Sequence, residues 1–136
     1  MYLIKLIYAS RCKNNLNDKV IDDILASASR YNSAKGISGM LCYDTNFFLQ
    51  CLEGSRRTVN ELYSRILHDP RHESPVILQY EVISVRDFSE WEMAYVELTE
   101  DNKEKLYKFG LTDVFDPYSL SGDSANQLLI SLKHDL

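Results

Sequence analysis

Residues 37–55, ISGMLCYDTNFFLQCLEGS, determine the fold more than any other stretch of the chain. Two apolar runs, 37–43 and 46–53, flank the polar triplet Asp44-Thr45-Asn46, a pattern typical of a β-hairpin. The pair Gly54-Ser55 ends the second strand, and its serine is a suitable helix N-cap. This stretch therefore predicts strand, turn, strand and the start of a helix.

In the helix after this hairpin, apolar residues recur about every 3.6 residues, which predicts that one side of the helix is buried. Its basic start, Arg56-Arg57, is expected to be solvated, and Pro70 stops the helix. The stripe consists of Val59, Leu62, Tyr63, Ile66 and Leu67.

The residues before the hairpin predict a strand, a loop and a first helix. Residues 2–9 are apolar except for Lys5, which indicates a central strand. Residues 10–16 are polar, and residues 17–31 have helical periodicity. Asn15 and Asp18 resemble a capping box, and Asn32, Ser33 and Gly36 end the helix. Its apolar stripe is Val20, Ile21, Ile24, Leu25 and Ala28.

After the second helix we expect strands at 76–85 and 93–98. The order is then βαββαβ plus one strand, which predicts an α+β, ferredoxin-like βαββαββ sandwich with both helices on one sheet face. We divide the chain into a domain at 1–98 and a C-terminal helical cap at 99–136.

The cap is predicted to contain two helices, 102–109 and 124–133, joined by the turn-rich linker LTDVFDPYSLSG. The last helix has an apolar side formed by Leu128, Leu129 and Leu132. Two placements remain open: the helices cover the free sheet face, or they join a partner subunit.

Composition narrows the class of protein. The 136 residues suit one domain, and 45% hydrophobic residues suffice for a core. The net charge of −5 argues against nucleic-acid binding. There is neither a leader pattern nor an apolar run of about 20 residues, so we expect a cytoplasmic protein that does not enter a membrane. We expect reduced cysteines, Cys42 and Cys51 in strands and Cys12 on a loop.

Polar residues in apolar surroundings indicate a site. Tyr8, Asn32 and Gln50 are polar, and a buried polar group without a partner costs about 1–3 kcal/mol. They therefore bond to one another or to a ligand. Each also has a structural alternative. Tyr8 could be a strand tyrosine whose hydroxyl reaches solvent, Asn32 a helix C-cap, and Gln50 a residue on an exposed strand face. Trp91 and Met93 are alternatively ordinary core residues.

The two helices place further residues where a flat ligand could lie between them. Ile24, Ala28 and Asn32 are four residues apart on the first helix. Arg65 and Asp69 have the same spacing on the second, where a surface ion pair is the alternative. His72 follows the Pro70 break. Neither a phosphate-binding glycine loop nor a G-x-S-x-G motif is present, and the histidines lack zinc-ligand spacing.

Six segments in order resemble the BLUF domains, flavin-binding sensors of blue light. They are LIYAS around Tyr8, DILASASRYN before Asn32, GISGMLCY, FFLQCLEG around Gln50, RILHDPRH and FSEWEMAYV. The similarity covers about residues 1–97, and the last third resembles the helical cap of short BLUF proteins without an attached enzyme domain.

The resemblance implies FAD as cofactor and a role for each matching residue. Tyr8 would give an electron and a proton to the excited flavin, and the Gln50 amide would rearrange. Trp91 and Met93, on the last strand, would relay that change. Asn32, Arg65 and Asp69 would meet the pyrimidine side of the ring, and His72 the dimethylbenzene end. Ile24, Ile37 and Phe48 would wall the ring, and Ser27 would lie near the ribityl chain.

The chain departs from the usual BLUF pattern at three positions: Tyr31 replaces a common Asn, Ser38 a common Thr, and Cys51 a common aliphatic residue. These changes leave the residues of the light reaction in place. They could alter the pocket or the lifetime of the lit state.

The sequence thus predicts a photoreceptor rather than an enzyme. We expect it to signal to a response protein of unknown identity and to form homo-oligomers. One alternative is a flavin-independent, ferredoxin-like binding module. A weaker alternative is an acylphosphatase-like hydrolase, suggested by Arg11 after the first strand, although the glycine-rich loop of that class is missing.

Overall fold

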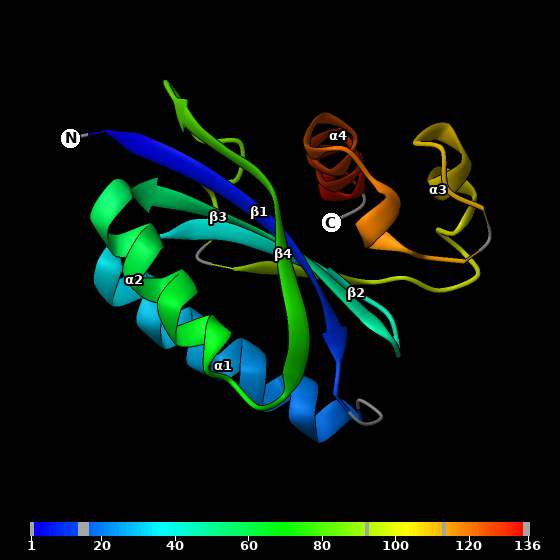
Figure 1. Ribbon diagram of the computed structural model, residues 1–136, viewed down its shortest axis with the longest axis horizontal. Coiled ribbons are helices and arrows are strands. Elements are labelled where there is room, and N and C mark those ends of the chain that lie inside the picture. Colours follow the sequence, from blue (N-terminus) through cyan, green and yellow to red (C-terminus); the bar gives the residue numbers. More distant parts are fainter. Residues whose placement is uncertain (1, 14–16, 92, 113, 135–136) are drawn as a thin grey trace.

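The computed structural model describes residues 2–13, 17–91, 93–112 and 114–134 (Figure 1). Its sheet has five strands in the order β4-β1-β3-β2-β5, antiparallel except for the β2–β5 pair. The elements are β1 (Leu3–Cys12), α1 (Asp18–Lys35), β2 (Ser38–Tyr43), β3 (Phe47–Ser55), α2 (Arg56–Leu67), β4 (His72–Ile83), β5 (Ala94–Glu97), α3 (Glu104–Lys108), the 3₁₀ helix Pro117–Ser119, and α4 (Gly122–Lys133).

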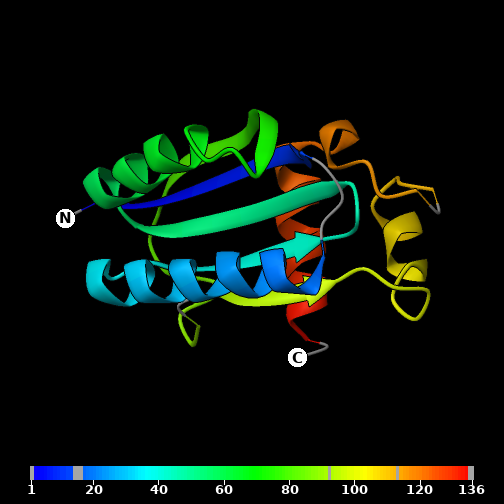
Figure 2. The same cartoon turned by 90° about the horizontal axis from the view of Figure 1, so that it is seen from below.

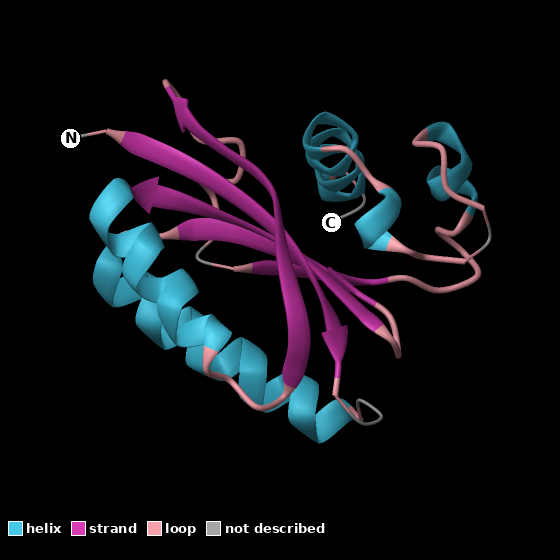
Figure 3. Ribbon diagram, viewed as in Figure 1, coloured by secondary structure: helices cyan, strands magenta, loops and turns pink. Residues whose placement is uncertain are grey.

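The elements form three layers, as Figure 3 shows by secondary structure. Helices α1 and α2 lie side by side along one face of the sheet, and Figure 2 looks onto that face. Helix α4 packs on the opposite face. The predicted ferredoxin-like arrangement is confirmed, and so is the central position of β1.

Helix α1 begins at Asp18 with Asn17 as its N-cap, whose side chain accepts from the Val20 N–H at 2.9 Å. Asn15, expected in a capping box, lies outside the described residues. The helix continues past Asn32 and ends where Gly36 adopts a left-handed conformation with φ of 66°. The predicted end at residue 31 was therefore too early, because the stop comes from this glycine.

Helix α2 begins at its predicted N-cap, Ser55, which accepts from the Thr58 N–H at 3.3 Å. Val59 and Leu62 are buried, as expected of the apolar stripe. Leu67 is 49% exposed, so its assignment to that stripe was wrong. It is the last residue of the helix, and the chain turns toward β4 directly after it.

The sheet extends further at one end than expected. Cys12 is the buried last residue of β1, not a loop residue, because its N–H donates to the Asn46 carbonyl and it pairs with His72. Strand β4 accordingly starts at His72 rather than at residue 76. Pro75 is tolerated there because β4 is an edge strand.

Strand β5 spans only Ala94–Glu97. Trp91 and Met93 precede it, so their prediction as strand residues was wrong. They belong to the connection between β4 and β5, which we call the crossing segment: residues 84–91 and Met93.

Of the two open placements for the C-terminal helices, the structure has them cover the free sheet face. Leu128, Leu129 and Leu132 of α4 are fully buried against the sheet. The backbone at Gly122 lies so close to Leu78 of β4 that a Cβ atom there would sit 2.6 Å from its carbonyl oxygen. Within the described part of the chain, no helix has the length and apolarity needed to cross a bilayer.

A charged cluster is buried beneath α4. Lys5 of β1 and Glu53 of β3 are 1% and 0% exposed, and the lysine nitrogen lies 3.6 Å from the carboxylate. Lys5 also donates to Asp87 of the crossing segment and, at 2.9 Å, to Asn126 of α4. Burial alone would lower the pKa of Lys5, but the Asp87 hydrogen bond and nearby negative charges raise it. The lysine is therefore buried in its charged form with partners.

Candidate functional site

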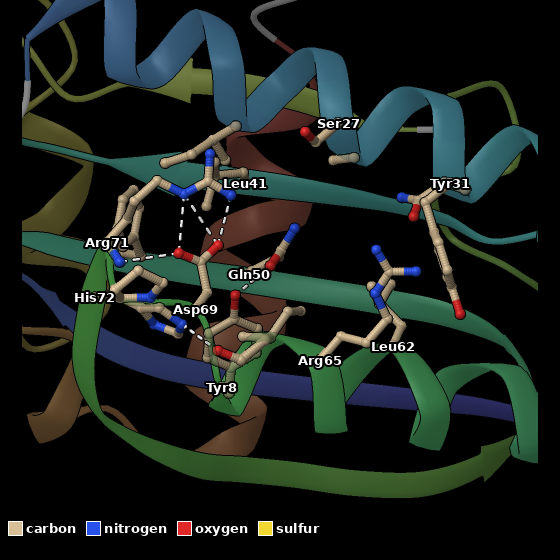
Figure 4. Close-up of a pocket in the computed structure, with 16 residues that line it drawn as sticks. Tyr8, Ser27, Tyr31, Leu41, Gln50, Leu62, Arg65, Asp69, Arg71 and His72 are labelled. Atoms are coloured by element: carbon tan, nitrogen blue, oxygen red, sulfur yellow. Dashed lines mark hydrogen bonds and ion pairs between the residues drawn. The ribbon is translucent and has the colours of Figure 1, made fainter.

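A cavity of about 430 Å³ lies between α1 and α2, above the middle of the sheet (Figure 4). Its walls come from both helices, four strands and the turn before β4. The lining residues are Tyr8, Ile24, Ser27, Ala28, Tyr31, Asn32, Leu41, Phe48, Gln50, Leu62, Arg65, Ile66, Asp69, Pro70, Arg71 and His72.

Tyr8 and Gln50 face each other across adjacent strands at the floor of this cavity. They are direct partners in the β1–β3 register, and the Tyr8 hydroxyl donates to the Gln50 side-chain oxygen. Both are buried. Burial, followed by the neighbouring Tyr63 and Asp69, raises the pKa of Tyr8 far above its usual value. The phenol thus keeps its proton across the physiological range.

The other end of the Gln50 amide is held by a sulfur atom. Its side-chain nitrogen donates to the Met93 Sδ at 3.3 Å. A thioether is a weak acceptor, so the amide is fixed less strongly on this side than by the phenol. Trp91 packs instead against the core under α4, where the Lys133 nitrogen lies 5.7 Å from its ring centroid.

One end of the cavity is formed by the turn between α2 and β4. Arg71 donates to Asp69 through its backbone and its guanidinium, with the closest ion-pair distance at 2.5 Å. Burial on its own would raise the pKa of Asp69, but these bonds outweigh it and hold the pKa below its usual value.

His72 lies beside this pair. Its Nε2 lies 2.6 Å from the Ile66 carbonyl, which identifies Nε2 as the donor. In the neutral ring the Nδ1 atom is an acceptor, and it is buried with no hydrogen-bond partner among the described residues. The ring lies 6.2 Å from that of Tyr8 and 6.3 Å from that of Phe48, centroid to centroid.

The opposite end is formed by Tyr31 of α1 and Arg65 of α2. The guanidinium carbon of Arg65 lies 4.4 Å from the Tyr31 ring centroid. Arg65 and Asp69 are not an ion pair in the structure, because Asp69 is bound by Arg71. The simple surface-pair alternative for these two residues is therefore wrong.

The cavity brings together most of the residues singled out from the sequence: Tyr8, Ile24, Ser27, Asn32, Phe48, Gln50, Arg65, Asp69 and His72. Ile37, expected in the wall, does not line it. It precedes β2 and packs in the core with Leu52 and Val59, beside the close approach of Gly54.

Sequence reasoning missed several lining residues. Tyr31, Leu62 and Ile66 have the helical spacing of neighbours that were identified, so the periodicity could have indicated them. Leu41 and Pro70 look like an ordinary strand residue and an ordinary helix stop. Arg71 gave no signal, because its place depends on the turn that brings it back onto Asp69.

The cavity suits a flat heteroaromatic ring. Apolar side chains of Ile24, Leu41, Phe48 and Ile66 contribute its walls, and Gln50, Arg65 and the free His72 Nδ1 offer polar atoms. Such a slot with few convergent polar groups is typical of cofactor sites.

The family model described as "BLUF: Sensors of blue-light using FAD" matches residues 3–94. The chain belongs to the BLUF family. It is therefore a blue-light sensor domain whose cofactor is FAD, and the resemblance seen in the sequence is confirmed.

Relatives of this BLUF chain include much longer proteins. Photoactivated adenylate cyclase subunit alpha of Euglena gracilis is 29% identical over 135 residues, covering 96% of this chain and 13% of that protein. The blue light- and temperature-regulated antirepressor BluF of Escherichia coli (strain K12) is 30% identical over 114 residues, covering 84% of this chain and 27% of that protein. The chain thus spans only a small part of these curated relatives.

Solved BLUF structures match nearly the whole chain. The photo-activated state of BlsA superposes with a TM-score of 0.84 at 31% identity, covering 96% of this chain and 94% of that one. The dark-state structure of BlrB, a BLUF protein, superposes with a TM-score of 0.75 at 31% identity, covering 99% of this chain and 98% of that one. The similarity therefore includes the C-terminal helices.

Proposed function

We propose that this BLUF photoreceptor holds FAD non-covalently between α1 and α2 and reports light through the hydrogen bonds of Gln50. The observation that carries this proposal is the bonded series from the Tyr8 hydroxyl through the Gln50 amide to the Met93 sulfur. Residues 1–98 form the flavin-binding part and residues 99–136 the cap.

When bound, FAD supplies absorption of blue light and, once excited, a site that accepts an electron. Tyr8 would then give up an electron, and its proton would pass through the Gln50 amide. Electron and proton would both return to Tyr8 afterwards, so that nothing is consumed. Burial suits Tyr8 to this role, because it keeps the phenol protonated and excludes water from the transfer.

Each remaining pocket residue contributes to binding or orientation. Asn32 and Arg65 serve the polar edge of the pyrimidine ring, whereas Asp69, expected at the same edge, lies with Arg71 and His72 at the other end of the cavity. Ile24 and Phe48 contact the ring faces. His72 lies at the dimethylbenzene end, and Ser27 is placed near the ribityl chain.

The signal leaves the site when the Gln50 amide rearranges and its bond to Met93 changes. A hydrogen bond is worth about 0.5–1.5 kcal/mol, enough to shift a two-state segment several-fold. The segment concerned is the one that carries Trp91 and Met93 into β5. A second protein reads the result, and the photoreceptor acts as a homo-oligomer.

Absorption spectra in darkness and after blue light test this proposal. The purified protein should be yellow, and its absorption should shift to longer wavelength on illumination and recover in darkness. A colourless protein, or a yellow one without that shift, would favour a flavin-independent binding module. Sedimentation in both states tests the oligomer.

A further inference from the structure

Arg65 carries donors that no protein group uses. Among the described residues its side chain makes no hydrogen bond or ion pair, because the Asp69 carboxylate is bound by Arg71. Its guanidinium lies over the Tyr31 ring at 4.4 Å. A ring face offers no lone-pair acceptor, so this contact fixes the guanidinium and leaves its five N–H groups available.

The contact also lies at the right place for a ligand. Tyr31 and Arg65 both line the cavity, and Figure 4 shows them reaching toward each other from α1 and α2. Asp69, Arg71 and His72 form the other end. The Arg65 guanidinium is thus available to a ligand at one end of the cavity, whereas at the other end Asp69 and Arg71 are already paired with each other.

We propose that Tyr31 is a positioning residue for the flavin: it holds Arg65 so that the guanidinium meets a carbonyl oxygen of the ring system. The inference rests on the proposed binding site between α1 and α2. Without the aromatic ring, Arg65 would have to be ordered when FAD binds. Ordering one such side chain costs about 0.5–1.5 kcal/mol.

Titration of apo-protein with FAD, followed by quenching of flavin fluorescence, tests this role. Tyr31→Leu should raise the Kd about 2- to 10-fold, which corresponds to that ordering cost. Tyr31→Phe keeps the ring and should bind as the wild type does. Tyr31→Glu should also raise the Kd, because a carboxylate would occupy the donors of Arg65.

A double-mutant cycle separates positioning from general packing. In an Arg65→Met background, Tyr31→Leu should have no further effect on the Kd. Equal effects in both backgrounds would overturn the proposal. So would a Tyr31→Leu protein that binds FAD like the wild type. Wild-type protein that binds no FAD would instead refute the proposed function, and the unfolding temperature of each apo-variant shows whether it is folded.

Riboflavin and FMN identify the oxygen that Arg65 meets. An effect of Tyr31→Leu that is equal for riboflavin, FMN and FAD supports a ring carbonyl. An effect confined to FMN and FAD would place Arg65 at a phosphate and overturn the assignment to the ring.

A second inference comes from the opposite sheet face, where the crossing segment is tied to β3 and α4. The Glu53 carboxylate accepts from the backbone N–H groups of Asp87 and Phe88 at 2.8 and 3.0 Å. Glu53 lies three residues after Gln50, so β3 holds the crossing segment at Asp87–Phe88 and at Met93, from opposite faces of the sheet.

Helix α4 is linked to the same segment from two of its turns: Lys133 contacts it directly, and Asn126 reaches it through Lys5. Lys133 donates to the Asp87 carbonyl at 2.5 Å and lies 3.7 Å from the Glu90 carboxylate. Asn126 accepts from Lys5, which in turn donates to Asp87. A displacement of the crossing segment therefore strains partly buried polar contacts of α4.

We infer that Asn126 and Lys133 are the groups through which α4 responds to light, an inference that again rests on the proposed function. Deuterium uptake of the α4 backbone, compared in darkness and under blue light, tests it. The light-dependent difference over 122–133 should be lost in the Asn126→Leu, Lys133→Met double variant, while its spectral red shift persists.

Lys105→Met is the matched control. Lys105 donates to the Ser131 carbonyl at 3.1 Å, so this variant loosens α4 from α3. Among the described residues, Lys105 has no hydrogen bond or ion pair with the crossing segment. It should keep the light-dependent difference. A double variant that responds like the wild type would overturn the inference, as would a wild type whose spectrum shifts while α4 does not respond. Absence of the red shift in the wild type would refute the proposed function instead.

Discussion

Met93 accepts a hydrogen bond from the Gln50 amide at 3.3 Å, while Trp91, two residues earlier, packs on the other side of the sheet. In a β-strand, residues two apart share a face. These two do not, because both precede β5. The methionine therefore belongs to the flavin side and the tryptophan to the α4 side.

Replacing Met93 with leucine should change the lit-state lifetime. Leucine keeps the apolar volume but removes the sulfur acceptor of Gln50, a bond worth about 0.5–1.5 kcal/mol at most, so the dark recovery rate should change about 2- to 10-fold. Recovery of the flavin absorption after a light pulse measures it. Trp91→Phe, on the opposite side, should leave the dark spectrum unchanged. A Met93→Leu protein with wild-type spectra and recovery would contradict the assigned contact.

Tyr8→Phe should bind FAD but show no red shift, because phenylalanine has no hydroxyl to give to Gln50. Difference spectra before and after blue light measure the effect. Tyr63→Phe is the control, since the Tyr63 ring lies 5.5 Å from that of Tyr8 and no hydrogen bond joins its hydroxyl to Gln50. Normal photoconversion of Tyr8→Phe would remove the proposed role of Tyr8.

Local signals made the hairpin, α2 and the order of helices and strands along the chain predictable. Asp44 accepts from the N–H groups of Asn46 and Phe47, and Ser55 caps α2, and both arrangements follow from residues close in sequence. The pairing of Tyr8 with Gln50 was also accessible, because two polar groups in apolar strands need partners.

Features that depend on the meeting of distant segments were not predictable. Cys12 becomes a strand residue only because β4 and the 44–46 turn lie beside it. Asp69 was expected to lie beside Arg65, four residues earlier, at the pyrimidine side of the flavin. The turn at Pro70 instead brings Arg71 onto the Asp69 carboxylate. The partners of the buried Lys5 lie 48, 82 and 121 residues away in the sequence, so no local pattern could predict them.

Lowering the pH should remove the contribution that the Asp69–Arg71 ion pair makes to the stability of the fold. The folded-state pKa of Asp69 is below its usual value. Its contribution to stability is thus present above the unfolded pKa of about 4 and is lost as the pH falls through the folded value. Urea unfolding of the apo-protein between about pH 6 and 2.5 measures this contribution.

Asp69→Asn provides the comparison for this pH dependence. The difference in stability between wild type and variant should be largest above about pH 4 and should vanish in acid. It will be small, because this pair is partly exposed to solvent. A difference that stays constant down to the lowest pH would show that Asp69 contributes nothing through its charge.

Lys5→Met should be the most destabilising of these changes, because it leaves the Glu53 carboxylate buried without its cation. Removing one partner of a buried ion pair costs about 3–5 kcal/mol. Adding Glu53→Gln to Lys5→Met should restore part of that loss, since glutamine is neutral and its oxygen still accepts from the Phe88 N–H. Urea unfolding of the apo-proteins measures both effects. Arg57→Ala, which breaks a surface pair with Glu61, is the control and should cost less than about 1 kcal/mol. If Lys5→Met costs no more than this control, the buried lysine is not held in its charged form.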